Sequence, residues 1–269
     1  MLTRVPVDAY ANALAPLGID VVAMEVTRQL ATPHDMRETT RAMLSGPYVA
    51  TVVASRAAAF WLRSGAIATW ASSELGVPRT TAFGVAELGE IWAVGPATLR
   101  ELGEDYHFDD DPEGFGLPWR AHHPDGVTNG AELARAMIAS RSFVGEPVLV
   151  PRAADGRTDA IEILRAAGAH VVDVVAYRTT SLDRDNPNVR EGRDLLDAGG
   201  AAMCCLFAPS QVSALIGIMG PLPPLGTTFV AIGETTAAAL RAAGVEPLVA
   251  ATPTPEGLAQ AIALHLRPA

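Results

Sequence analysis

Two short stretches of this chain place a glycine and threonines where an apolar run gives way to a helical pattern. The first has Gly95 followed by Thr98, and the second has Gly233 followed by Thr235 and Thr236. In parallel α/β sheets, ligands bind at the carboxyl ends of strands, and a glycine there lets the backbone approach the ligand. The N–H groups and positive partial charge of the next helix start favour an anion. The two stretches therefore predict anion-binding corners, facing one shared ligand across a cleft.

Four more residues lie at the ends of strand-like runs. Ser55 and Ser210 follow two of these runs, and Arg4 and Arg152 end the strands of two similar strand–arginine–helix segments. The planar guanidinium fork of arginine suits carboxylates and phosphates. Serine and threonine in such places are also ordinary helix N-caps, so the sequence leaves both interpretations open.

The composition narrows the classes of function. Of the 269 residues, 49% are hydrophobic and 19% charged, which allows one large domain or two of ordinary size. The net charge of −10 argues against a nucleic-acid partner. All 20 basic residues are arginine, which excludes lysine Schiff-base chemistry and a Walker-type phosphate loop.

Other features point to a reduced, metal-free and membrane-free protein. No apolar run reaches the roughly 18 residues needed to cross a bilayer, and the first residues lack a signal-peptide pattern. Cys204 and Cys205 are adjacent in an apolar run and read as buried thiols, which fits the cytoplasm. His122 and His123 lack a third ligand at suitable spacing, and the acidic run 109–111 lacks a calcium-loop pattern.

Apolar strand patterns alternate with helical patterns along the chain. The predicted strands are 18–24, 48–55, 90–95, 147–152, 169–177, 202–208, 228–233 and 246–251. Helices predicted over 8–17, 158–167 and 235–243 each end at a glycine suited to a left-handed C-cap. Thr254 followed by Pro255 and Glu256 predicts the start of the last helix. The alternation indicates an α/β fold with mostly parallel sheets.

Four kinds of segment occur twice in the same order, which indicates two domains of one fold. A simple division lies near residue 145. Alternatively, the polar stretches 25–33 and 177–187 are connectors, and residues 34–176 form a domain inserted into the other. Spacing alone does not choose between these divisions.

The ordered set of motifs resembles the uroporphyrinogen-III synthase family. It comprises the N-terminal LTR, VVASRAAA, AVGPATLREL, VLVPRAADGRTDAIEILRAAGAHVVDVVAYRT and VAIGETTAAALRAAGVEPLVAATPTPEGLAQAI, which together cover most of the chain. The resemblance implies two flavodoxin-like domains joined by a two-stranded connector. It selects the nested division, with residues 1–30 plus 180–269 as the outer domain and 34–176 as the inserted one.

The resemblance also implies an activity and a site. The family cyclises hydroxymethylbilane, a linear tetrapyrrole with eight carboxylates, with loss of water and inversion of the last ring. It uses no cofactor or metal. Tyr177 matches the family's V-Y-R-T tyrosine, which either donates a proton to the leaving hydroxyl or positions the substrate; Ser55, Thr98 and Thr236 match its polar cleft residues. We expect a cytoplasmic monomer with a small-molecule substrate. A non-catalytic tetrapyrrole sensor and a small-anion binding protein are the alternatives.

Overall fold

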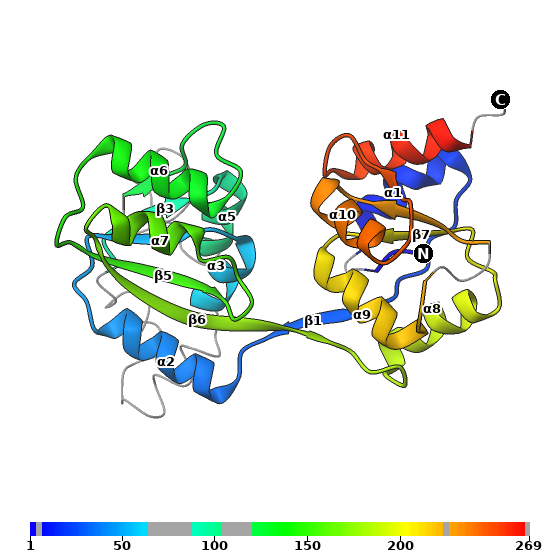
Figure 1. Cartoon of the computed structure of the whole chain (residues 1–269), viewed down its shortest axis with the longest axis horizontal. Coiled ribbons are helices and arrows are strands. Elements are labelled where there is room, and N and C mark those ends of the chain that lie inside the picture. Colours follow the sequence, from blue (N-terminus) through cyan, green and yellow to red (C-terminus); the bar gives the residue numbers. More distant parts are fainter. Residues whose placement is uncertain (4–6, 64–87, 104–119, 223–225, 267–269) are drawn as a thin grey trace. The chain divides into compact units, whose positions relative to one another are not determined.

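The computed structural model describes residues 1–3, 7–63, 88–103, 120–222 and 226–266. The chain forms two compact units, each with its own sheet and helices (Figure 1). Unit 1 comprises Met1–Arg28 and Thr180–Ala269, and unit 2 comprises Gln29–Thr179. Unit 2 is therefore inserted into the chain of unit 1.

Unit 2 is a parallel sheet with helices on both faces. Its strands are β2 (Ala50–Val53), β3 (Glu90–Ala93), β4 (Ala121–His122), β5 (Pro147–Ala153) and β6 (His170–Ser181), and its helices are α2 (Pro33–Leu44), α3 (Arg56–Arg63), α5 (Pro96–Gly103), α6 (Gly130–Ser140) and α7 (Asp159–Ala166). The strand order is β6-β5-β2-β3-β4, with parallel neighbours throughout. Helices α2, α3 and α5 contribute to the core on one face, and α6 and α7 to the core on the other.

The apolar sequence of β2 shows why this sheet needs two layers of helices. All four of its residues are buried, although successive side chains of a strand point to opposite faces. Val52 belongs to the core beneath α6 and α7, and Val53 to the core beneath α3 and α5. Continuous apolar runs of this kind are typical of parallel strands covered on both sides.

Unit 1 repeats this architecture with shorter strands. Its elements are α1 (Asp8–Leu14), the 3₁₀ turn η1 (Ala15–Leu17), α8 (Pro187–Asp197), β7 (Met203–Leu206), α9 (Pro209–Met219), β8 (Thr228–Ala231), α10 (Glu234–Ala242), β9 (Leu248–Val249) and α11 (Pro255–His265). Strands β7, β8 and β9 are parallel neighbours, and Leu2 forms parallel bridges to both Cys205 and Ala23. Counted from the strand–arginine–helix segment, both units have the flavodoxin-like order 2-1-3-4-5. The predicted fold class is confirmed.

Most predicted helix ends are also confirmed. Gly18, Gly168 and Gly244 all have positive φ angles, between 69° and 88°, as left-handed C-caps require. The helix predicted over 8–17 is α-helical only to Leu14, because Pro16 has no N–H to continue the hydrogen-bond ladder. The strand predicted over 18–24 is reduced to the isolated bridge at Ala23.

The chain crosses between the units along two segments that lie side by side. Strand β1 (Thr27–Leu30) is the sheet neighbour of β6 (Figure 1). The Leu182 N–H donates to the Val26 carbonyl over 2.9 Å, and the Thr180 hydroxyl donates to the Arg28 carbonyl over 3.2 Å. These two segments form the two-stranded connector. Of the helices that the structure describes, none is both long and apolar enough to cross a bilayer.

Candidate functional site

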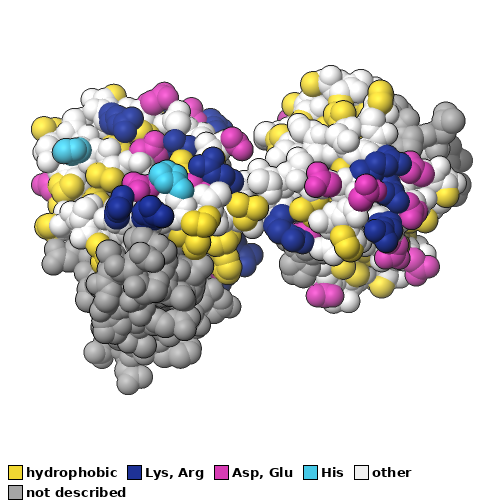
Figure 2. Space-filling model, turned by 90° about the horizontal axis from the view of Figure 1, so that it is seen from below, with side chains coloured by type: hydrophobic (Ala, Val, Ile, Leu, Met, Phe, Trp, Pro, Cys, Tyr) yellow, Lys and Arg dark blue, Asp and Glu magenta, His cyan; other side chains and the backbone are white. Residues whose placement is uncertain are grey.

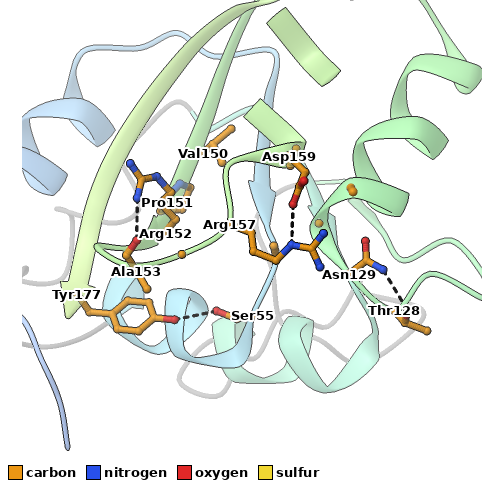
Figure 3. Close-up of a pocket in the computed structure, with 15 residues that line it drawn as sticks. Ser55, Thr128, Asn129, Val150, Pro151, Arg152, Ala153, Arg157, Asp159 and Tyr177 are labelled. Carbon is orange, nitrogen blue, oxygen red and sulfur yellow. Dashed lines mark hydrogen bonds and ion pairs between the residues drawn. The ribbon is translucent and has the colours of Figure 1, made fainter. Parts of the chain in front are cut away.

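A pocket of about 280 Å³ lies in unit 2 at the carboxyl ends of its strands (Figure 3). The ends of β2, β5 and β6 supply one part of its wall. The starts of α3, α6 and α7 supply the rest. The lining residues are Ala54, Ser55, Thr128, Asn129, Gly130, Ala131, Val150, Pro151, Arg152, Ala153, Gly156, Arg157, Asp159, Ala160 and Tyr177. Three helix N-termini around one pocket favour a negatively charged ligand.

Tyr177 and Ser55 meet in this pocket. The phenol oxygen lies 3.3 Å from the serine hydroxyl, within hydrogen-bond distance (Figure 3). Ser55 also accepts a hydrogen bond of 3.0 Å from the Ala58 N–H. Ser55 is thus both a helix N-cap and a pocket residue, so the two interpretations of this serine hold together. Tyr177 is 6% exposed, with its ring packed in the core and its hydroxyl directed toward Ser55.

A β-bulge places Tyr177 at this position. Strands β5 and β6 pair in register up to Arg152 and Val175, but the next pair is Ala153 with Tyr177. Ala176 is therefore an extra residue in β6. A bulge of this kind changes the direction of the following side chain and is common beside active sites.

Arg152 lines the pocket, but its guanidinium is engaged within unit 2. Its Nε and Nη2 donate to the two carboxylate oxygens of Asp173 over 2.7 and 3.0 Å. Its Nη1 donates to the carbonyls of Ala153 and Ala154 over 2.9 and 3.0 Å. These four hydrogen bonds leave one of the five guanidinium N–H groups for a ligand.

The pocket contains polar residues that the sequence analysis missed. Arg157 is 77% exposed at the side chain and pairs with Asp159 over 2.6 Å at the start of α7. This hydrogen bond raises the pKa of Arg157 and lowers the pKa of Asp159. Asn129 caps α6 by accepting from the Glu132 N–H over 3.0 Å. The sequence T-N-G-A-E already carries this N-cap pattern, with a glutamate in the first turn.

The two glycine corners have open space at the glycine itself. A Cβ built on Gly95 or Gly233 meets no heavy atom within 4 Å. Thr98 and Thr236 are only 3% exposed, and their N–H groups bond to the Gly95 and Gly233 carbonyls. Thr235 is exposed. The freely accessible polar side chain is therefore Thr235, while Thr98 and Thr236 lie mostly in the interior.

The remaining predicted residues lie in unit 1. Ser210 is exposed in the first turn of α9, and Arg4 lies outside the described residues. Ala208, the N-cap residue of α9, makes no side-chain capping hydrogen bond, and the Gln211 side chain in the first turn bonds to groups outside the helix. The Gln211 Oε1 accepts from the Phe207 N–H over 2.7 Å and from the Thr3 hydroxyl over 2.8 Å.

The described surface uses many of its arginines in ion pairs. Figure 2 shows arginine and acidic side chains interleaved on the visible face. In unit 1 the pairs include Arg184 with Asp197 and Arg241 with Glu246. Across the described residues, no three histidine, cysteine, aspartate or glutamate side chains could hold a metal ion together. The acidic run 109–111 lies outside the described part of the chain.

Two parallel sheets of the same strand order, one unit inserted in the other, and a polar pocket at strand ends define a two-domain α/β protein with a pocket suited to a small anionic molecule. The chain belongs to the uroporphyrinogen-III synthase HemD family, whose sequence profile matches residues 8–260.

Solved structures show the same fold. A mutant uroporphyrinogen III synthase from the extremely thermophilic bacterium Thermus thermophilus has 18% identity and a TM-score of 0.57, covering 98% of this chain and 97% of its own. Uroporphyrinogen-III synthetase from Helicobacter pylori has 17% identity and a TM-score of 0.57, covering 93% and 96%. No curated protein sequence matches significantly.

Proposed function

We propose that this chain converts hydroxymethylbilane into uroporphyrinogen III, with loss of water and inversion of the last pyrrole ring. Membership of the synthase family supports this reaction. The observation that carries it is the Tyr177–Ser55 pair in a pocket surrounded by three helix N-termini. A polycarboxylate can be held there largely by main-chain N–H groups, although the protein carries a net charge of −10.

Tyr177 donates the proton that the leaving hydroxyl group needs. Its phenol O–H is the donor, and the Ser55 hydroxyl fixes its direction from 3.3 Å away. Departure of water leaves an azafulvenium cation on the first ring. The terminal ring attacks this cation through its substituted carbon, and fragmentation and reclosure of the spiro intermediate invert that ring. The pocket must also hold the substrate in a conformation that the free molecule seldom adopts.

The substrate carboxylates bind at several corners in this proposal. Arg157 and the starts of α6 and α7 bind one carboxylate in the pocket of unit 2. The open backbone at Gly95 and at Gly233, the exposed Thr235, Ser210 and Arg4 contribute further contacts. Thr98 and Thr236 lie in the first helical turns of these corners but are only 3% exposed, so Thr235 is the threonine whose side chain reaches the substrate. The protein acts as a monomer in the cytoplasm, without a cofactor.

The test is to supply purified protein with hydroxymethylbilane and to separate the uroporphyrinogen isomers by chromatography. The proposal expects the type III isomer as the main product. Hydroxymethylbilane closes spontaneously to the type I isomer, so formation of type I alone overturns the proposal. Binding of hydroxymethylbilane without type III product would instead identify a tetrapyrrole-binding protein.

A further inference from the structure

The guanidinium of Arg152 joins two neighbouring strands behind the pocket. Arg152 is on β5 and Asp173 is on β6, and their bidentate pair is mostly shielded, with side chains 20% and 23% exposed. Bidentate arginine–carboxylate pairs fix the mutual orientation of both groups. Asp173 lines a different pocket, together with His34 and Arg178, and is not among the residues around Tyr177.

The same guanidinium holds the chain segment that pairs with Tyr177. Its Nη1 donates to the carbonyls of Ala153 and Ala154 directly after the bulge. The Ala154 N–H in turn donates to the Tyr177 carbonyl over 2.8 Å. A continuous path thus runs from Asp173 through Arg152 and the peptide group between Ala153 and Ala154 to the carbonyl of Tyr177.

We propose that Arg152 and Asp173 are positioning residues that fix the bulge and so direct the Tyr177 hydroxyl toward Ser55. This inference rests on the proposed function, because it assigns the pair to the proton donor of that reaction. It gives Arg152 a role other than substrate binding. Four of its five N–H groups are already engaged, so only one remains for a carboxylate.

The decisive substitutions are Asp173→Asn and Arg152→Lys. Asparagine keeps the shape of Asp173 but loses its charge, and lysine cannot bind the carboxylate and two carbonyls in the same fork geometry. We expect kcat to fall about 10-fold in each variant, with KM changed less than about 2-fold, because only an interaction that orients the transition state is lost. The kcat of the double variant should be no lower than that of either single variant, because both substitutions break the same arginine–aspartate pair.

Two further measurements separate positioning from general weakening of the fold. In a Tyr177→Phe background, Asp173→Asn should leave the remaining kcat unchanged, because the group it positions is absent. The matched control is Asp197→Asn, which removes an arginine–aspartate pair from unit 1, where Arg184 also donates to a main-chain carbonyl. That variant should keep the wild-type kcat.

Hydrogen exchange tests the inference without the reaction. The Ala154 amide should exchange on the order of 10-fold faster in Asp173→Asn and Arg152→Lys, by NMR, because its bond to Tyr177 is loosened. Unchanged exchange at Ala154 overturns the inference, even if the wild-type protein forms no type III product. The inference is also overturned if Arg152→Lys raises KM without changing kcat and Asp173→Asn changes neither value. Arg152 would then be a substrate contact.

Discussion

The two units share one sheet order but differ at matching corners. In unit 2, Arg152 lies two residues after Val150, whose register partner on β6 is Asp173. In unit 1, Arg4 lies two residues after Leu2, whose register partner is Ala23. At the position that Asp173 occupies in unit 2, unit 1 therefore has Ala23. The two units thus share a strand order and a glycine corner, but at this pair of matching positions only unit 2 has a carboxylate.

The two units also differ in how the equivalent helices α3 and α9 are capped. Helix α3 is capped by Ser55, which also contacts Tyr177. Helix α9 has Ala208 as its N-cap residue, without a side-chain cap, and the Gln211 amide oxygen accepts hydrogen bonds from the Phe207 N–H and the Thr3 hydroxyl. The Gln211 amide oxygen is thus engaged within unit 1, whereas Ser55 faces a pocket in unit 2. We infer that unit 2 carries the chemistry and that unit 1 contributes mainly binding.

The largest effect expected is that of Tyr177→Phe. Loss of the phenol proton donor should lower kcat on the order of 100-fold and leave KM nearly unchanged. Steady-state kinetics with hydroxymethylbilane measures both values. The matched control is Tyr48→Phe, because Tyr48 is equally buried in unit 2 and donates to the Ala42 carbonyl. Tyr48→Phe should keep kcat; equal turnover of the two variants would remove the catalytic role from Tyr177.

The next largest effect is on stability, and it concerns Asp35, a buried aspartate that caps a helix of unit 2. Asp35 is 1% exposed on α2, where it completes a capping box with Thr32 and accepts two hydrogen bonds from Arg178. Burial raises its pKa, but the hydrogen bonds from Arg178 and Thr32 outweigh this and lower the pKa to about 2. The corresponding helix of unit 1, α8, is capped by Asn186, which does not titrate.

Asp35 should therefore make unit 2 sensitive to acid. The carboxylate stabilises the folded state above the ordinary pKa of 3.8, and this contribution is lost as the pH falls toward 2. Asp35→Asn should lower the free energy of unfolding of unit 2 by about 2 kcal/mol at pH 7. In this variant the stability of unit 2 should also fall less between pH 4 and pH 2 than in the wild-type protein. Urea unfolding monitored by NMR signals of each unit measures this. An equal acid sensitivity of unit 1 and unit 2 in the wild-type protein would contradict the assignment.

The glycine corners test whether both units bind substrate. A methyl group on Gly95 or Gly233 meets no protein atom, so alanine at either position should leave the fold intact apart from a small change in helix capping. If the ligand approaches the backbone at both corners, KM should rise about 10-fold in each variant, for a loss of about 1.4 kcal/mol of binding. Gly217→Ala on α9 is the control, since its methyl group also meets nothing. An unchanged KM in Gly233→Ala alone would restrict substrate binding to unit 2.

Local chemistry made much of the fold predictable from the sequence. Gly168 and Gly244 mark helix ends because only a residue without Cβ adopts their positive φ angles easily, and Thr254 caps α11 through the Gly257 N–H. Helix α2 was overlooked, although Thr32 and Asp35 form a recognisable capping box. The choice of the nested division came from the family resemblance, because spacing fits either division.

The site was less predictable, because its contacts join residues that are far apart in the chain. Tyr177 and Ser55 are 122 positions apart, and neither periodicity nor capping rules relate them. Arg152 was recognised as an arginine at a strand end, but the sequence does not show that Asp173 engages it. That depends on the register between β5 and β6 and on a bulge. Arg157 was missed for a similar reason, since only the folded loop brings it to the pocket.

The smallest effect is expected from substituting the N-cap residues of α3 and α9, so that unit 2 loses a serine cap and unit 1 gains one. Ser55→Ala should destabilise unit 2 by about 1 kcal/mol, because the Ala58 N–H loses its acceptor. It should also lower kcat, since Tyr177 loses its partner. Ala208→Ser should stabilise unit 1 by up to about 1 kcal/mol, because Ala208 already has the extended backbone of an N-cap. Turnover should not change, because Ala208 is not among the residues that line the pocket of Tyr177 and Ser55.

Thermal unfolding and steady-state kinetics on the two cap variants together decide how far the units have diverged. If both substitutions change only stability, Ser55 is an N-cap like any other, and the corners of the two units are equivalent. If Ser55→Ala lowers kcat by more than its loss of folded protein explains, the hydroxyl orients the phenol as well. A drop in kcat for Ala208→Ser would place chemistry in unit 1 and break the division of roles, because the added hydroxyl would then act on the substrate itself.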